Sequence, residues 1–396
     1  MWKIRSTSGA SCLRRSSVKS SNPVETATDP HAGPAADAET VRRAHRALDI
    51  LAAEHDRIGL AVSGGSDSTA LLVLASDWAR AHGKLIRVAT VDHGLRPEAA
   101  AEAEGVAALA HRLGLAHDTL RWRPETTHVT QASARTARHD LLAIWARAHD
   151  LPLVAMGHTR DDRVETFLMR ARAGSGWRGL AGPMPAAASP AGRLRIIRPL
   201  LALARRDLRR RLLQRGHGWI EDPSNRMMRH ERVRMRALAG DRLGEPTCGR
   251  IIRTMDGLAA MRAAVTAAAR EALETKVDAA SGQAMLDAAA FRALDREPQL
   301  RLAEALVMAA GGAARLPDAG GLDRLARRMA EPGGLQRGAT LAGAWIAETR
   351  GALRIRRAPP RRASSGVLNQ SRPVPMFDLE RAEALLADPR IGALFV

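Results

Sequence analysis

The chain has few cysteines and no long apolar run. Among its 396 residues only Cys12 and Cys248 are cysteines, so one chain cannot build a disulfide framework or a paired-cysteine metal or sulfur site. This scarcity points to a reducing compartment. No run of about 18 apolar residues occurs, which argues against a membrane-spanning helix. We therefore expect a cytoplasmic protein that has no membrane partner.

The pattern of a secretory signal is also missing. Residues 1–40 are rich in serine, proline and alanine, carry charges that nearly cancel, and lack an apolar core. Arg14 and Arg15, followed by two serines, have the character of an organellar presequence, but the second half of the segment is acidic. We favour a disordered N-terminal extension, or a start assigned too early.

Acidic residues are outnumbered by basic ones. The chain holds 61 Lys+Arg against 42 Asp+Glu, a formal net charge of +19, and nearly all the cations are arginine. This excess favours nucleic acid over membrane as a partner, because no segment offers a basic amphipathic helix with a bulky aromatic face. Residues 193–236 hold fourteen arginines against four acidic residues, which favours contact with a phosphate backbone. The alternatives are a compositional bias toward alanine and arginine, and a solvated helix face over Arg205 to Arg215.

The glycine-rich loop at 63–68 lacks the lysine of a Walker A phosphate loop. Residues 58–69 read IGLAVSGGSDST, which predicts a buried strand, a turn and a helix start. Gly64 and Gly65 allow close approach of a ligand, and the helix start supplies unpaired N–H groups, so the stretch predicts an anion site. The serine hydroxyls add donors, and Asp67 could hold a divalent metal or cap the helix. A serine-capped turn without a ligand is the alternative.

Predicted strands alternate with predicted helices through the first half of the chain. We expect strands at 58–63, 85–91, 116–121 and 153–156. This alternation predicts an α/β fold, a parallel sheet with helices on both faces.

Candidate binding residues follow three of these strands. Ligands of such sheets lie at the carboxyl ends of the strands, where the motifs at 63–68, 92–96 and 157–162 are expected to meet. Asp92 and His93 should line a nucleotide pocket there, although they could instead cap a turn. Whether Arg135 or Arg138, on the helix expected at 131–149, reaches the same cleft is left open.

Carboxylates gather at one predicted helix start. His158, Asp161, Asp162 and Glu165 have the spacing i, i+3, i+4 and i+7, which would place them on one helical face. Carboxylates favour a helix start through the dipole, yet a stack without a neighbouring cation would repel. We expect a cation or an amine to bind there, and disfavour zinc because the two-histidine spacing is absent.

The C-terminal third has weaker signals. A linker is expected near 240–246, followed by a smaller, mostly helical domain with helices at about 249–276, 286–310 and 321–330. Residues 339–348 and 352–357 could pair as a hairpin. We expect residues 241–358 to form an RNA-binding appendage and 359–396 a basic flexible tail, in which 377–395 could form a last helix.

Several motifs together resemble a known family. The SGG-x-DS loop resembles the pyrophosphate loop of the N-type ATP pyrophosphatases. The segments 91–96, 158–168, 174–180, 198–201 and 219–225 resemble, in this order, the signatures of the tRNA(Ile)-lysidine synthetases. One position departs from the family pattern: Val233 stands where an asparagine is usual, which puts in doubt a hydrogen bond near the nucleotide or RNA.

The resemblance implies an adenine nucleotide alpha hydrolase-like domain over residues 41–240 and a ligase reaction. ATP would activate the wobble cytidine of the CAU-anticodon isoleucine tRNA, and free L-lysine would replace the AMP, giving lysidine and pyrophosphate. ATP and Mg²⁺ are the implied cofactors, and a homodimer is left open. The implied roles are ATP binding by Ser63, Gly64, Gly65, Ser66, Asp67, Ser68, Asp92 and His93; Mg²⁺ binding by Asp67; catalysis by Asp67, His158 and Asp161; lysine binding by Arg138, Asp162 and Glu165; and RNA binding by Arg178, Arg205, Arg206, Arg209, Arg210, Arg211, Arg232 and Arg236.

Three rival functions share parts of this sequence pattern. A tRNA sulfur-transfer enzyme would rely on paired cysteines, and Cys12 and Cys248 lie outside the motifs. A guanylate or asparagine synthetase would need a glutamine-hydrolysing module, for which no upstream catalytic cysteine is present. A nonenzymatic RNA-binding protein on the same scaffold is opposed by the intact loop and the acidic cluster, and favoured weakly by Val233.

Overall fold

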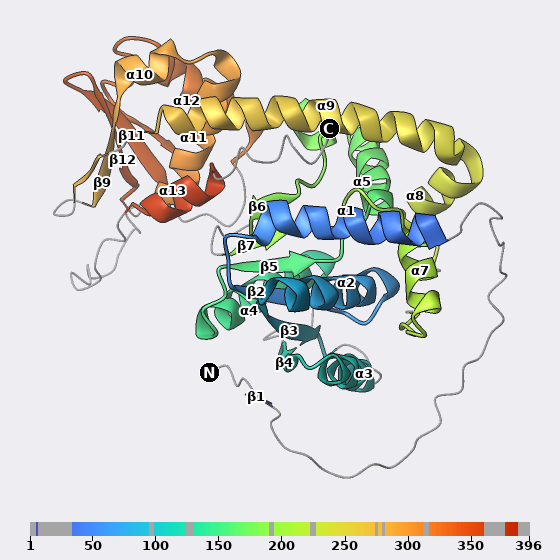
Figure 1. Cartoon of the computed structure of the whole chain (residues 1–396). Coiled ribbons are helices and arrows are strands. Elements are labelled where there is room, and N and C mark those ends of the chain that lie inside the picture. The colour runs from blue at the N-terminus through green and yellow to red at the C-terminus, as the bar shows by residue number, and fades with distance from the viewer. Residues whose placement is uncertain are drawn as a thin grey trace. The chain divides into compact units, whose positions relative to one another are not determined.

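The computed structural model (Figure 1) divides the chain into two compact units, one of Met1–Met169 with Ile197–Cys248 and one of Arg170–Ile196 with Gly249–Val396. It describes residues 5–6, 34–94, 99–123, 130–189, 194–221, 227–273, 276–278, 282–311, 317–359 and 377–386. The expectations for 7–33, 95–98, 222–226, 360–376 and 387–396 lie outside these residues.

A parallel sheet forms the centre of the first unit. Its strands are β2 (Arg57–Ala61), β3 (Leu85–Asp92), β4 (Ala116–Arg121) and β5 (Leu153–Met156), in the order β4-β3-β2-β5, and each neighbouring pair is parallel. Every residue of β5 is buried, as expected for a strand covered on both faces. The predicted parallel α/β fold is confirmed. A two-residue strand, β1 (Arg5–Ser6), pairs antiparallel with β4.

Helices connect and cover these strands. In the first unit they are α1 (Pro34–Ala52), α2 (Ser66–His82), α3 (Ala99–Arg112), α4 (Gln131–Ala148), α5 (Arg160–Arg172), α7 (Arg205–Gln214), α8 (Glu231–Ala237) and the π-helix η2 (Leu238–Leu243). Helix α2 packs against both α1 and α7. Its Leu71, Leu72 and Trp78 are fully buried. Helix α1 begins inside the segment expected to be a disordered extension.

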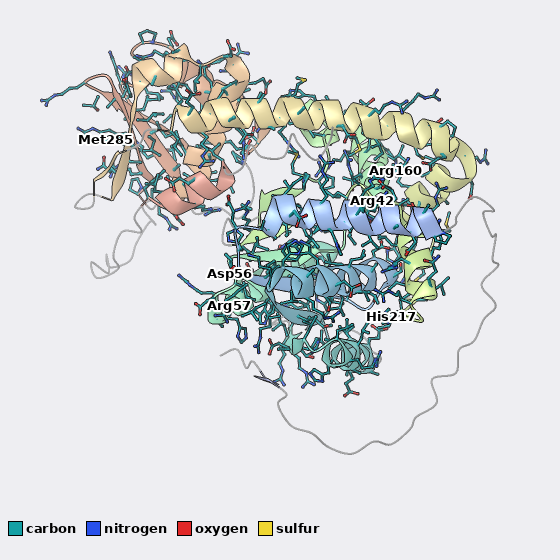
Figure 2. All side chains as sticks on the ribbon, in the orientation of Figure 1. Arg42, Asp56, Arg57, Arg160, His217 and Met285 are labelled. Carbon is teal, nitrogen blue, oxygen red and sulfur yellow. The ribbon has the colours of Figure 1, made fainter. Side chains whose placement is uncertain are left out.

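The two ends of the strands differ in character. The amino end of β2 lies at the surface, where Asp56 and Arg57 are exposed (Figure 2). Its carboxyl end leads directly into the loop at 63–68, and β3 and β5 run parallel to it. The three motifs that follow these strands therefore begin at one edge of the sheet, as predicted.

The second unit is built around an antiparallel sheet. Between the two segments of the first unit the chain forms α6 (Trp177–Leu180), β6 (Ala186–Ala188) and β7 (Arg195–Ile197). The long helix α9 (Gly244–Glu271) precedes a five-stranded sheet in the order β10-β11-β12-β9-β8. Its strands are β8 (Lys276–Asp278), β9 (Gln283–Asp287), β10 (Ala339–Leu341), β11 (Ala344–Thr349) and β12 (Ala352–Arg357), and its helices are α10 (Ala288–Ala293), α11 (Arg296–Gly311), α12 (Ala319–Ala330) and α13 (Leu379–Leu385).

The expected hairpin is present as β11 and β12. The single helix expected over 286–310 is instead divided. Asp287 ends β9 and its side chain caps α10, and the extended backbone of Leu294, with a ψ of 147°, separates α10 from α11. Strands β8 and β9 were not expected, and the arm expected over 339–348 is divided into β10 and β11, which pair with each other. None of the helices in the described part of the chain is both long and apolar enough to cross a membrane.

Candidate active site

The loop between β2 and α2 depends on its first glycine. Gly64 has a φ of +87°, a conformation that favours glycine. A Cβ at this position would lie 2.3 Å from Ile220 Cδ1, and the Ile220 N–H donates to the Gly64 carbonyl at 2.9 Å. The segment at 219–221 is thereby pinned against the loop.

Serine hydroxyls hold the loop in shape. Ser68 Oγ accepts from the Ser63 N–H at 3.2 Å and donates to the Gly65 carbonyl at 3.0 Å. Ser66 Oγ donates to Asp67 Oδ1 at 3.0 Å. Gly65 is the N-cap of α2 and has no side chain that could bond the N–H groups of the first turn. These N–H groups can therefore bind an anion.

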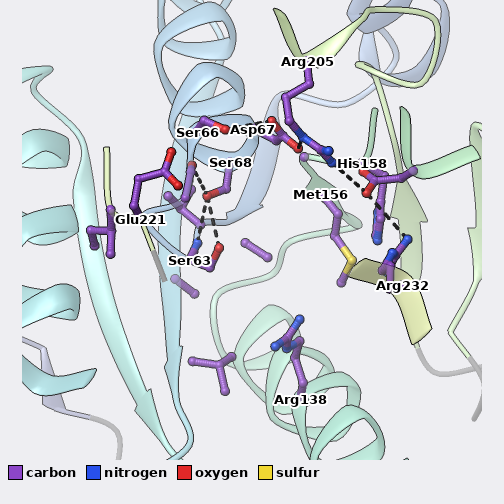
Figure 3. Close-up of a pocket in the computed structure, with 18 of the residues that line it drawn as sticks. Ser63, Ser66, Asp67, Ser68, Arg138, Met156, His158, Arg205, Glu221 and Arg232 are labelled. Atoms are coloured by element: carbon purple, nitrogen blue, oxygen red, sulfur yellow. Dashed lines mark hydrogen bonds and ion pairs between the residues drawn. The ribbon is translucent and has the colours of Figure 1, made fainter. Parts of the chain in front are cut away.

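A cavity of about 380 Å³ lies in front of this loop (Figure 3). Loop residues form one wall, and Arg138, Met156 and His158 come from α4, the end of β5 and the following turn. Arg205, Arg209, Arg232, Arg236 and Glu221 complete the lining. Segments far apart in the sequence therefore meet at the edge of the sheet where the ligand was expected.

Arg205 lies among three carboxylates. Its Nε is 2.8 Å from Asp67 Oδ2, and its terminal nitrogens are 3.1 Å from Asp162 Oδ1 and 3.3 Å from Glu165 Oε1. Burial disfavours its charge, but the three carboxylates outweigh burial and raise the pKa of Arg205 above its ordinary value. Burial in turn raises the pKa of Asp67, against the effect of Arg205.

Two further arginines surround Glu165. Its side chain is 1% exposed and accepts from Arg232 Nε at 2.8 Å and Arg236 Nε at 2.7 Å. The idea that the acidic group has no neighbouring cation is therefore wrong. The cations come from α7 and α8, which sequence spacing around residue 160 cannot indicate.

The expected single acidic face is divided. Asp162 forms a capping box with Thr159, in which Asp162 Oδ2 accepts from the Thr159 N–H at 2.8 Å. Only its Oδ1 faces the arginines, and Arg205 and Arg232 outweigh burial and lower the pKa of Asp162. Asp161 Oδ2 accepts from the backbone N–H of Arg205 at 2.8 Å, so it caps α7 and does not line the first cavity.

His158 precedes α5 and lines the cavity. Burial and the charge of Arg198 lower the pKa of His158 to about 3, so its imidazole is uncharged at neutral pH. Its buried Nδ1 has no hydrogen-bond partner among the described residues. The ring can therefore form a hydrogen bond with a ligand in the cavity.

Asp92 and His93 do not line the cavity, although Val91 before them and Arg138, which His93 contacts, do. Asp92 Oδ1 accepts from the Gly94 N–H at 2.9 Å, which is the turn-capping alternative. His93 Nε2 is 3.2 Å from an Arg138 terminal nitrogen. The adjacent Val91 and Ala89 line the cavity directly, so adenosine binding by Asp92 and His93 themselves stays a prediction.

The eight arginines predicted to bind RNA lie in different surroundings. Arg205, Arg209, Arg232 and Arg236 line the cavity, and Arg209 Nε is 3.2 Å from Ser66 Oγ. Arg206 is 65% exposed. Three others are ion-paired, Arg210 with Asp207, Arg211 with Asp37, and Arg178, in the second unit, with Glu304. Their binding of RNA stays a prediction.

The donors around Asp67 fit a magnesium ion bound mainly through phosphates. Among the described residues no group of three potential metal-ligating side chains is present, so an all-protein cage is absent from that part of the chain. Mg²⁺ commonly uses one or two carboxylates together with substrate phosphates and water. Asp67, at the start of α2 and next to the Ser66 hydroxyl, meets this requirement.

A second cavity of about 490 Å³ lies on the other side of Arg205. Asp161, Glu165 and Cys248 line it, and Arg205, Arg209 and Arg236 line both cavities. Gly157 and Ile220 lie in segments that the sequence singled out, but their close packing against the Asp67 backbone and Gly64 was not predicted. Thr159 was detectable as the first residue of a T-x-x-D capping pattern.

Several known proteins are similar to this chain in sequence or in fold. The model of the PP-loop domain matches residues 37–242. A tRNA(Ile)-lysidine synthase from Hyphomonas neptunium is 41% identical over 297 residues, covering 74% of this chain and 79% of the relative. One from Bradyrhizobium sp. is 39% identical over 347 residues, covering 80% and 96%. Among solved structures, a U34-tRNA thiolase from Methanococcus maripaludis is 15% identical with a TM-score of 0.48, covering 57% of this chain and 78% of that one. Since the PP-loop match spans more than half of the chain and the relatives align over most of their length, the chain belongs to the tRNA(Ile)-lysidine synthase family.

Proposed function

We propose that this protein joins L-lysine to C2 of the wobble cytidine, position 34, of the isoleucine tRNA with a CAU anticodon, consuming ATP and releasing AMP and pyrophosphate. The observation that carries the proposal is the cavity in which an SGG-x-DS loop at a helix start faces a set of carboxylates and arginines. Family membership supplies the substrate class.

The chain's residues account for the first half of the reaction. The oxygen on C2 of cytidine is a poor leaving group, so it must first attack the α-phosphate of ATP. The N–H groups at the start of α2 and the serine hydroxyls hold the departing pyrophosphate. Arg205 and Arg209, which reach Asp67 and Ser66, are placed to offset the negative charge that grows there. Mg²⁺ bound at Asp67 would supply further neutralisation of the phosphates.

In the second half the lysine amine attacks C2 and AMP leaves. The amine must be uncharged to attack, so a nearby group must accept its proton. Asp162 and the uncharged ring of His158 both line the cavity, so either is placed to accept the proton. We assign the lysine to Arg138, Asp162 and Glu165, with the carboxylates binding the ammonium. Asp161 positions Arg205 through the backbone of α7.

The remaining assignments extend the same proposal. Arg206 and Arg210 of α7 contact tRNA phosphates, and the enzyme works in the cytoplasm, where charged and modified tRNAs are used. A homodimer stays a prediction that light scattering can test. Sulfur transfer is not favoured, because burial raises the pKa of the Cys248 thiol and so disfavours the thiolate that such chemistry needs.

The test is transfer of label from L-lysine to RNA. Purified protein with ATP, Mg²⁺ and labelled lysine should label an isoleucine tRNA transcript with a CAU anticodon, and should leave a methionine tRNA transcript with the same anticodon unlabelled. The Asp67→Ala variant should release no AMP while still retaining the tRNA on a filter. No label transfer, with an active relative working in parallel, would contradict the proposal.

A further inference from the structure

The two carboxylates assigned to the lysine ammonium, Asp162 and Glu165, already have a cation beside them. Asp67, Asp162 and Glu165 surround the guanidinium of Arg205 at 2.8, 3.1 and 3.3 Å. Arg232 and Arg236 bind Glu165 as well. Three carboxylates thus face three guanidinium groups. A lysine ammonium that binds Asp162 and Glu165 would have to displace the arginine that already bonds both, Arg205.

Arg205 is the arginine that links this cluster to the phosphate loop. Among the described residues, Arg205 is the one of these three arginines that bonds Asp67 of the SGG-x-DS loop. The ion pairs that Arg232 and Arg236 form within the described part of the chain are with Asp162 and Glu165 of α5. The ion pairs of Arg205 therefore connect two parts of the site that would bind different substrates. Asp67 lies on the triphosphate side, and Asp162 and Glu165 lie on the amine side.

The side chain of Arg205 can move while its backbone stays fixed. Its N–H is held by Asp161, and α7 packs against α2. A triphosphate on the first turn of α2 would lie next to the guanidinium and offer it new anionic partners. A Mg²⁺ ion on Asp67 would at the same time compete for the carboxylate that holds Arg205 Nε.

We propose that Arg205 and the lysine ammonium compete for Asp162 and Glu165, and that magnesium-bound ATP decides the competition by drawing Arg205 toward the phosphates. Arg205 is then a positioning residue that orders the two small substrates, with ATP before lysine. An amine cannot occupy the acidic site until a nucleotide is present to be consumed. This inference rests on the proposed function, because it takes lysine as the amine.

Equilibrium dialysis of radiolabelled L-lysine tests the order directly. The wild-type protein should bind lysine at least about tenfold more tightly when Mg²⁺ and α,β-methylene-ATP are present, which is within the usual range of coupling between two sites. Arg205→Gln removes the competing charge, so it should bind lysine without nucleotide about as tightly as the wild type does with it. Arg205→Lys retains a cation and should keep part of the nucleotide dependence.

A matched control is available at the other end of the same helix. Arg215 follows α7 and pairs only with Asp77 among the described residues, at 2.9 Å, so Arg215→Gln should keep the wild-type nucleotide dependence. Equal lysine affinity of the wild type with and without nucleotide would overturn the inference, as would a full dependence in Arg205→Gln.

If Arg205→Gln does not fold, the lysine affinity of the wild type with and without nucleotide tests the order of binding by itself. Should the protein make lysidine but show no nucleotide dependence, only the order of binding is wrong. Should it bind no lysine under any condition and label no tRNA, the proposed function fails together with this inference.

Discussion

At the scale of single residues, buried histidines make the fold sensitive to acid. Burial lowers the pKa of His117 and of His139 to about 4, and that of His158 to about 3. Between these values and the ordinary value near 6.5, the unfolded chain binds protons that the folded chain does not. Stability is therefore lost as pH falls below 6.5, by about 1.4 kcal/mol per pH unit for each histidine.

His139→Gln should remove one of these contributions. We expect the free energy of unfolding of the wild type to fall steeply between pH 6.5 and 4.5, and the slope to be shallower in the variant by up to about 1.4 kcal/mol per pH unit. Urea unfolding at several pH values measures both slopes. His111→Gln, at an exposed position of α3, is the control. Equal slopes for wild type and His139→Gln would contradict the assignment.

The residues of the site were predictable where a local pattern marks them. The loop at 63–68 and His158, Asp162 and Glu165 were found from spacing and residue type. The pairing of Arg205 with three carboxylates was not, because it joins residues about forty and more than a hundred positions apart. A charge cluster read as an RNA footprint contains side chains that face the cavity.

At the scale of elements, Gly157 lets two of them touch. It follows β5, and a Cβ on it would lie 2.8 Å from the Asp67 carbonyl oxygen and 2.9 Å from Ser68 Cα. Both are backbone atoms of the first turn of α2, which cannot move aside without displacing the phosphate loop. Gly157→Ala should therefore weaken binding of an ATP analogue by at least about tenfold and lower stability by about 1–3 kcal/mol.

Titration calorimetry and urea unfolding check this expectation. Gly105→Ala is the matched control, because Gly105 lies exposed within α3 with no other heavy atom within 4 Å of an added Cβ. That change should leave nucleotide affinity unaltered and raise stability by about 0.5–1 kcal/mol. Unchanged affinity in Gly157→Ala would show that the contact does not shape the loop.

Elements with strong periodicity were predicted almost to their ends. Strands β4 and β5 and helix α4 match the expected ranges closely, because α4 has helical spacing and the two strands are short segments between predicted helices. Strand β9 reads QAMLD, and alanine and methionine have little preference for strands. Its place in a sheet comes from pairing with β12, about seventy residues later, which no local pattern reveals.

At the scale of the whole molecule, the excess of +19 should give tRNA binding a steep salt dependence. Each phosphate contact that is lost reduces the slope of log K against log salt by about 0.7–0.9. Changing both Arg206 and Arg210 to glutamine should thus reduce the slope by about 1.5. Filter binding between roughly 50 and 200 mM salt measures this slope, because the affinity of phosphate contacts falls strongly over that range.

Arg42→Gln serves as the control for this pair. Arg42 lies on α1, is 68% exposed and pairs with Glu39, so its loss should leave the slope unchanged. If the double variant keeps the wild-type slope, the arginines of α7 form a solvated face, the alternative that composition left open.

The interleaving of the two units limits how the chain can be cut. Residues 170–196 belong with 249–396, where Arg262 donates to the carbonyl oxygens of Arg178 and Gly182, and Arg178 pairs with Glu304. A truncation after residue 240, at the boundary that the sequence indicates, would strip these partners from a segment that remains in the shortened product. Removing the C-terminus at this boundary therefore does not isolate the first unit cleanly, because residues 170–196 stay attached to it without the segment that they pack against.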